Sequence, residues 1–152
     1  MYTHCLFPNS NSNPSIFYFH IYFWFPLYRN VTNNAVYGLL IESGDGANAM
    51  VYVNGEVTID NNSDGIGADV DSGSNLNVVV NEGATLTSCK NTDYDITGNI
   101  ESDTNVAFSG DGTYVCDQSK VLFTGDGNET VVEPTCQPCP LGLAIGPVPP
   151  SP

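Results

Sequence analysis

A cluster of acidic and amide side chains around a glycine turn is the clearest candidate binding site in the chain. Residues 60–65 match D-x-[DN]-x-[DN]-G, the first half of a calcium-binding loop. Calcium takes about six to eight oxygen ligands, and closely spaced carboxylates and amides supply them. The spacing predicts a calcium site formed by the side chains of Asp60, Asn62, Asp64 and Asp71 with the carbonyl of Ile66. The alternative interpretation is a solvated acidic loop.

Three Gly-Asp-Gly turns offer a second arrangement of carboxylates. They follow short apolar runs and contain Asp45, Asp111 and Asp126. If equivalent turns were superposed, the three carboxylates would form a row, which is favourable mainly when a cation bridges the like charges. The simpler interpretation is that each aspartate has its ordinary role in a turn.

Residue types suited to catalysis are sparse. Within residues 30–133, Lys90 and Lys120 are the two basic residues, because Arg29 precedes this region. The motifs G-x-S-x-G, H-E-x-x-H and the P-loop do not occur in the sequence. Glycosidases need only two carboxylates, and 17 acidic residues supply such pairs by chance. We therefore expect a protein that is not an enzyme, and we predict no catalytic residue.

Short runs of strand-forming residues occupy the middle of the chain and are separated by Gly, Asn, Asp and Ser, which favour turns. No ten-residue window has a helical period, so the sequence predicts an all-β fold. The runs are Val36–Ile41, Met50–Val53, Val57–Ile59, Leu76–Val80, Thr85–Thr87, Asp95–Thr97, Val106–Phe108, Thr113–Val115, Val121–Phe123 and Thr130–Val132.

Two architectures accommodate these runs: a parallel β-solenoid and an antiparallel β-sandwich. The solenoid is favoured because the units resemble one another, as stacked coils do. The segments Asn77–Cys89 and Asn105–Cys116 align as strand, glycine turn, strand and cysteine. Strands at 51–53, 78–80 and 106–108 recur about 27 residues apart, which suits one coil. We therefore predict a small parallel β-solenoid and keep the sandwich as the alternative.

This repeat style over residues 36–132 resembles the right-handed parallel β-helix proteins of the pectin-lyase-like class. The resemblance implies one of two roles: polysaccharide lyase or hydrolase activity, or a non-catalytic surface or adhesive role. Lyases of this class rely on a basic residue and often on calcium. The hydrolases use an Asp trio with neighbouring His and Arg motifs, and that pattern does not occur in this sequence.

Both ends of the chain differ from the repeats. Residues 1–29 are rich in aromatic residues, and three interpretations stay open: a degenerate signal or membrane anchor, a hydrophobic cap on the repeats, or a wrongly joined start. Residues 134–152 form a Cys/Pro-rich tail. Its segment Cys136–Gly142 resembles the C-x-x-C-P-x-G opening of ephrin-receptor-like modules of extracellular proteins. The solenoid repeats are expected between these ends, over residues 30–133.

Four of the five cysteines are disulfide candidates. In a solenoid, Cys89 and Cys116 would lie on adjacent strands about 4.8 Å apart, which permits a bridge between them. The alternative is a ladder of two buried thiols. Cys136 and Cys139 suit a disulfide within the tail better than a redox pair, because no helix follows them. Zinc is not expected, because both histidines lie in the N-terminal segment.

Glycosylation signals and the cysteines together indicate a secreted or cell-surface protein. The acceptor residues of the three N-x-[ST] sequons are Asn30, Asn61 and Asn128. The net charge of −14 argues against nucleic acid and against an anionic membrane surface as partners. A membrane contact is expected only through the N-terminal segment.

The predicted role is therefore a non-catalytic extracellular module for adhesion or for binding polysaccharide or an extracellular protein, with calcium as a stabilising ion. Two alternatives stay open. One is a polysaccharide lyase or glycoside hydrolase of the same class, and the other is a structural spacer or a fragment of a larger surface protein.

Overall fold

The computed structural model describes residues 3–7, 16–21, 29–32, 34, 36–44, 46–125 and 127–141, with side chains from residue 32 onward. In these ranges the chain forms β-strands and one short 3₁₀ helix, η1 (Gln118–Lys120). The prediction of an all-β fold is confirmed. The predicted signal or anchor in residues 1–29 falls partly outside the described residues, as does the tail beyond residue 141.

The strands belong to three sheets of five strands, which we name A, B and C. In spatial order, sheet A contains β1 (Thr3–Phe7), β4 (Tyr37–Ser43), β7 (Asp64–Val70), β10 (Ile96–Ile100) and β13 (Val121–Gly125). Sheet B contains β14 (Thr130–Val132), β11 (Asn105–Ser109), β8 (Asn75–Val80), β5 (Asn48–Val53) and β2 (Ile16–Ile21). Sheet C contains β15 (Cys136–Gln137), β12 (Thr113–Cys116), β9 (Thr85–Cys89), β6 (Glu56–Asp60) and β3 (Arg29–Thr32).

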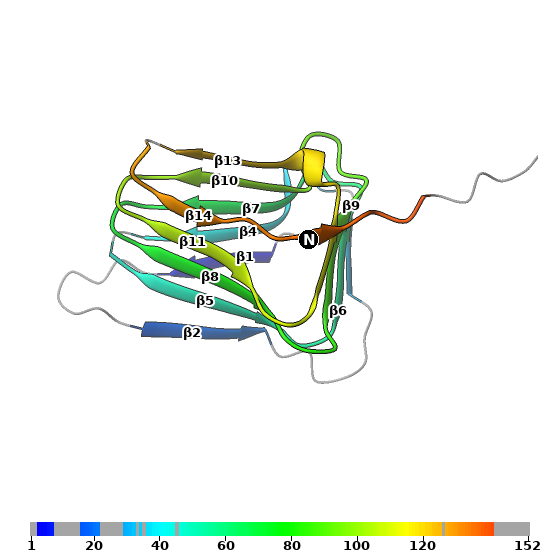
Figure 1. Cartoon of the computed structure of the whole chain (residues 1–152), viewed down its shortest axis with the longest axis horizontal. Helices are drawn as coiled ribbons and strands as arrows, with labels where there is room; N and C mark the ends of the chain where they lie inside the picture. Colours follow the sequence, from blue (N-terminus) through cyan, green and yellow to red (C-terminus); the bar gives the residue numbers. More distant parts are fainter. Residues whose placement is uncertain are drawn as a thin grey trace, which may run out of the picture.

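The chain is a parallel β-solenoid. It visits sheets A, B and C in turn, and each strand lies beside the strand three strands later, so that the sheets appear as stacks of arrows (Figure 1). We number the resulting coils from one (β1–β3) to five (β13–β15). Every strand pairing runs parallel, from β1 with β4 to β12 with β15. This excludes the antiparallel sandwich, whose neighbouring strands run in opposite directions.

Equivalent residues of successive coils lie side by side. Asn75 is paired with Asn48 and with Asn105, at separations of 27 and 30 residues. Val53 is paired with Val80, and both side chains are buried. The predicted coil length is therefore close to the observed one, and the register places apolar side chains of one parity inside the coil.

The interior is filled by aliphatic side chains from all three sheets. The burial pattern of β5 and β8 alternates, with every second residue buried. Burying one Val, Leu or Ile side chain stabilises a fold by about 1.5–3 kcal/mol, so these columns are the main source of stability. The largest fully buried apolar side chains are Ile41, Ile59, Ile66, Leu76, Ile96, Ile100, Val51, Val70, Val78, Val80 and Val106.

Strand β7 was not among the predicted runs, because its sequence DGIGADV contains two glycines and two aspartates. The glycines make room for neighbouring side chains. A Cβ atom on Gly67 would lie 2.6 Å from Cδ1 of Tyr37, and one on Gly65 would collide with Ser88 Oγ. The glycines that make this sequence look like a loop are therefore required by side chains that pack against β7 from β4 and β9.

Aromatic side chains fill the interior at coils four and five. The ring of Phe108 lies 6.2 Å from that of Tyr114 and 5.6 Å from that of Phe123. Phe123 is paired with Gly98, and a Cβ atom there would lie 2.5 Å from Phe123 Cδ1. The absence of a side chain at Gly98 thus makes space for the phenylalanine ring above it.

Candidate functional site

The corner between sheets C and A carries a buried ladder of asparagines. Asn34, Asn62 and Asn91 occupy this corner in three successive coils, and all three are buried. The Oδ1 atom of Asn62 accepts hydrogen bonds from the backbone N–H of Asn34 (3.0 Å) and from its Nδ2 (2.9 Å). The backbone N–H of Asn62 donates in turn to Oδ1 of Asn91 at 3.0 Å. Buried amides with both groups paired join adjacent coils without a loss of polar contacts.

Asn62, predicted as a calcium ligand, is therefore part of this ladder. It is 2 % exposed, and its Nδ2 donates to the backbone carbonyl of Asp60 at 3.1 Å. Its carboxamide oxygen points to Asn34 of the preceding coil. The D-x-[DN]-x-[DN]-G pattern here places an amide inside the corner.

Asp60 and Asp64 lie on either side of Asn62, and each accepts a backbone hydrogen bond from the next coil. Asp60 Oδ1 accepts from the N–H of Cys89 at 3.2 Å, and Asp64 Oδ1 accepts from the N–H of Tyr94 at 3.1 Å. Partial burial raises the pKa of both carboxyl groups, and these hydrogen bonds oppose the shift. Asp60 thus helps to fix the spacing between coils two and three, and Asp64 that between coil three and the connection before β10.

Asp71 and Ile66, the other predicted calcium ligands, lie elsewhere. Asp71 follows the last residue of β7, whereas Asp64 is its first residue, and a strand of this length spans about 20 Å. Ile66 is 1 % exposed, and its N–H donates to the Asp95 carbonyl at 3.0 Å. The structure does not bring the five predicted ligands together, and calcium binding by this chain stays a prediction.

The two lysines of the repeats differ in environment. Lys120 Nζ donates to the backbone carbonyl of Asn91 at 2.6 Å and to that of Thr92 at 3.2 Å. Its ammonium group therefore joins the end of η1 to the turn that follows β9. Lys90 is exposed and has a positive φ of 56°.

The disulfides differ from the predicted pairings. The structure joins Cys89 to Cys139 and Cys116 to Cys136, so neither a Cys89–Cys116 nor a Cys136–Cys139 bridge is present. The register explains this, because Cys116 lies beside Ser88, one residue away from the position opposite Cys89.

Both bridges attach the C-terminal segment to sheet C. Cys136 in β15 is paired with Tyr114, and its Cα atom lies 5.3 Å from that of Cys116. The Cα atoms of Cys89 and Cys139 are 6.0 Å apart. The segment 134–141 is therefore held against β9 and β12.

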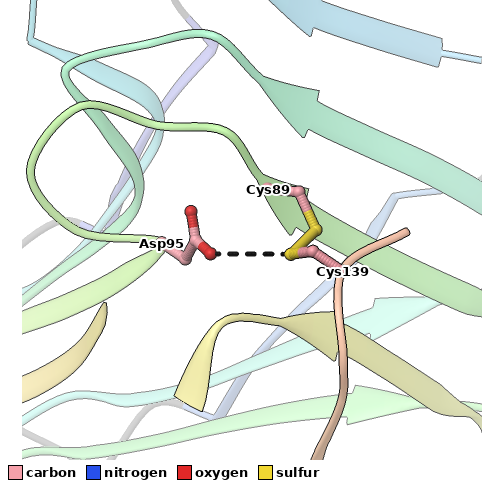
Figure 2. Close-up of side chains that lie close together, drawn as sticks. All are labelled: Cys89, Asp95 and Cys139. Carbon is pink, nitrogen blue, oxygen red and sulfur yellow. Dashed lines mark hydrogen bonds between the residues drawn. A yellow bond between two sulfur atoms is a disulfide. The ribbon is translucent and has the colours of Figure 1, made fainter. Parts of the chain in front are cut away.

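A buried carboxylate lies beside one of these bridges. Asp95 is 0 % exposed, and its Oδ2 lies 3.9 Å from Cys139 Sγ (Figure 2). Its Oδ1 accepts a hydrogen bond from Asn91 Nδ2 at 2.9 Å, and its Oδ2 accepts one from the backbone N–H of Asp117 at 2.8 Å. In the described part of the chain, Cys89, Asp95 and Cys139 are the one group of three cysteine, histidine or acidic side chains with ligand atoms within 4.8 Å of one another.

Sequence reasoning gave Asp95 no functional role. It was expected as the first residue of a strand, and nothing in its local sequence distinguishes it from the other acidic residues. Its burial depends on Asn91 and on the turn at Asp117, both of which are positioned by the coil geometry.

Two of the predicted glycosylation sites are exposed. Asn61 lies at the corner beside the buried ladder with a φ of 56°, and Asn128 lies in the turn after β13. Asn30 belongs to β3, where the backbone alone is described. Glycosylation itself stays a prediction.

One aspartate of the predicted row of Gly-Asp-Gly carboxylates lies in the described part of the chain. Asp111 lies in the turn between β11 and β12, which joins sheets B and C. Asp45 and Asp126 lie outside the described residues. The row of carboxylates therefore stays a prediction.

The outer surface of sheet B presents one column of asparagines and two columns of mixed side chains. Asn75 Nδ2 donates to Asn48 Oδ1, and Asn105 Nδ2 donates to Asn75 Oδ1, both at 2.7 Å. In the other columns, Tyr52 is paired with Val79, and Met50 with Asn77. We call this surface the sheet B face; it comprises Asn48, Met50, Tyr52, Asn75, Asn77, Val79, Asn105, Ala107 and Ser109.

No protein-family model, curated protein or solved structure matches the chain. The parallel β-solenoid is therefore established by the strand pairings, and membership of the pectin-lyase-like class and the ephrin-receptor-like module stay predictions. Within the described ranges, no helix has the length and apolar character needed to span a bilayer.

Proposed function

We propose that the protein is a non-catalytic extracellular module that binds a neutral polysaccharide through the sheet B face, in a surface or matrix role. The observation that carries the proposal is the stacking of outward side chains in regular columns, with amides in one column and Tyr52 in another. The asparagine column suits a repeating ligand, because three successive strands present the same amide one strand further along.

The chemistry of the sheet B face supports this choice. Each amide in the column from Asn48 to Asn105 has two donors and an acceptor oxygen, and the ladder bonds use part of this capacity. Sugar hydroxyls bind to such amides. The half-buried ring of Tyr52, whose hydroxyl donates to Met50 Sδ at 3.6 Å, offers an apolar surface beside them.

The negative net charge of the chain favours a neutral polysaccharide over an acidic one. The chain carries 17 acidic residues and three basic residues, so an acidic polysaccharide would be repelled. A neutral chain of sugars avoids this repulsion. The two disulfides are consistent with the proposed extracellular location, because such bonds persist in oxidising environments.

The test is binding of the full chain to an array of neutral and acidic polysaccharides, followed by titration of the strongest ligand. We expect Tyr52→Ala to weaken binding by about tenfold, as the loss of one aromatic contact does. The matched control is Thr87→Ala, which changes a half-buried outward residue of sheet C. Equal effects of the two substitutions, or no binding to any polysaccharide, would contradict the proposal.

A product assay with the same polysaccharides distinguishes a binding module from an enzyme of the pectin-lyase-like class. The protein is incubated with each polysaccharide in the presence and absence of calcium, and the products are analysed for new reducing ends and unsaturated sugars. We expect neither product. Their appearance would favour a lyase or hydrolase, whereas an absence of all binding would favour a structural spacer.

A further inference from the structure

The group formed by Cys89, Asp95 and Cys139 has the composition of a metal site that a disulfide keeps closed. The two sulfur atoms are joined in the structure, and the Asp95 carboxylate faces them from the loop before β10 (Figure 2). The three ligand atoms lie within 4.8 Å of one another. Cys89 and Asp95 are buried, and the half-buried Cys139 connects the group to solvent.

Reduction of this bridge would leave two thiols beside the Asp95 carboxylate. A phosphine reductant and one water molecule convert the disulfide to two thiols and are themselves converted to a phosphine oxide. A divalent cation then replaces the two thiol protons, which are released to solvent. We propose that the reduced protein binds one zinc ion through Cys89 Sγ, Cys139 Sγ and Asp95 Oδ2. Two thiolates and one carboxylate with an open fourth position suit tetrahedral zinc.

The spacing of the group agrees with this coordination. Zinc–sulfur bonds are about 2.3 Å long and zinc–oxygen bonds about 2.1 Å, so ligand atoms around tetrahedral zinc lie about 3.5–3.8 Å apart. Asp95 Oδ2 is 3.9 Å from Cys139 Sγ. After reduction the two sulfur atoms must separate from bonding distance to about 3.8 Å, by rotation of the two cysteine side chains about Cα atoms that lie 6.0 Å apart.

Neighbouring groups already orient the carboxylate. Asn91 Nδ2 holds Asp95 Oδ1, and Asn91 is itself fixed in the buried ladder through Asn62. The backbone of Asp95 is held by its N–H bond to the Lys120 carbonyl at 3.0 Å. Such contacts behind a ligand typically change metal affinity by about 10–100-fold. The zinc ion would keep the segment 134–141 on sheet C after the covalent link is lost.

The test uses the full chain with Cys5→Ser, Cys116→Ser and Cys136→Ser, which leaves Cys89 and Cys139 as its two cysteines. The reduced protein is titrated with cobalt(II), and thiolate-to-cobalt charge transfer and the visible bands of tetrahedral cobalt are recorded. We expect one equivalent to bind and to be displaced by zinc. The oxidised form of the same variant should bind none.

Asp95→Asn in this background distinguishes a three-ligand site from a simple dithiol chelate. We expect affinity to fall by at least about tenfold, because one anionic ligand is lost. Asp93→Asn is the matched control, since Asp93 is exposed in the same loop. Equal affinities of the Asp95→Asn variant and its parent would overturn the proposal. So would an absence of binding, or a loss of the far-ultraviolet β-sheet signal on reduction that zinc does not restore.

Discussion

Coils three and four differ from coil five in what holds them together. Strands β7 to β12 have neighbours on both sides, bury aliphatic columns and share the asparagine corner at Asn62 and Asn91. Strands β13 to β15 are the outermost of their sheets, and few of their side chains are buried. This last coil is held by Phe123 and by two disulfides. An end of a solenoid lacks half of its stacking contacts, so other bonds must replace them.

Removing the disulfides should have the largest effect on the stability of the last coil. The bridges close loops with sequence separations of 50 and 20 residues. We expect Cys89→Ala with Cys139→Ala to lower the free energy of unfolding by about 4 kcal/mol, and Cys116→Ala with Cys136→Ala by about 3 kcal/mol. Urea unfolding followed by circular dichroism measures both. Cys5→Ser, outside both bridges, is the control. If reduced and oxidised wild-type protein unfold at the same urea concentration, the covalent anchoring of coil five is unimportant.

The asparagine corner is the feature of the central coils that corresponds to the disulfides of the last coil. Asn62→Ala removes the buried side-chain hydrogen bonds to Asn34 and to the Asp60 carbonyl, so we expect a loss of about 3 kcal/mol in unfolding free energy. Asn75→Ala removes two ladder bonds on the half-buried sheet B face and should cost less than about 1 kcal/mol, because water can replace them there. Chemical denaturation of the two variants gives the comparison. Equal losses would show that burial of the ladder has no energetic consequence.

Gly98, which is paired with Phe123, allows a test of side-chain packing at the end of the solenoid. Gly98→Ala places a methyl group 2.5 Å from the Phe123 ring, and we expect a loss of about 1–3 kcal/mol as the ring is displaced. Gly55→Ala is the matched control, because a Cβ atom there meets nothing within 4 Å. The melting temperatures of the two variants report the difference. A Gly98→Ala protein as stable as the control would mean that Phe123 is not packed on this coil.

Unfolding at alkaline pH tests the contribution of Tyr114 to stability without changing the size of a core side chain. Burial raises the pKa of Tyr114 to about 12 from its ordinary value of 10.0, and its hydroxyl donates to the Val78 and Ser109 carbonyls. Because the folded pKa is the higher one, the stabilisation is complete below pH 10 and is lost as the pH rises to 12. We expect a decrease of about 1–2 kcal/mol over this interval after allowing for solvent screening. The decrease should be smaller in Tyr114→Phe when urea midpoints are compared at both pH values, and an unchanged slope would contradict this assignment.

The best predicted elements are those with plain alternation of apolar and polar residues. Strands β5 and β8 were expected over Met50–Val53 and Leu76–Val80, and the structure extends each by one or two residues at its start. Their pattern is local, because a period of two places every second side chain inside whichever neighbours are present. Strand β7 lacks this pattern, since its glycines leave room for Tyr37 of the preceding coil and for Ser88 of the same coil.

The predicted grouping of side chains differs from the structure where hydrogen-bond or disulfide partners lie on a neighbouring coil. Asn62 sits in a sequence that suits calcium, yet its hydrogen bonds go to Asn34 and Asn91, at separations of 28 and 29 residues. The cysteine pairing depended on a register difference of one residue between β9 and β12. The hydrogen-bond partners of Asn62 and the pairing of the cysteines both depend on the lengths of the turns between strands. A local motif does not specify these lengths.

Composition and repetition by themselves determined a turn-rich chain of short strands with a coil of about 27 residues, an acidic surface and four cysteines able to form bridges. The tertiary structure alone decided which asparagines are buried, which cysteines pair and that Asp95 faces a disulfide. Side chains alternate along a strand for reasons inherent in the backbone. Contacts between coils depend instead on the register of strands far apart in sequence, which is set when the whole solenoid packs.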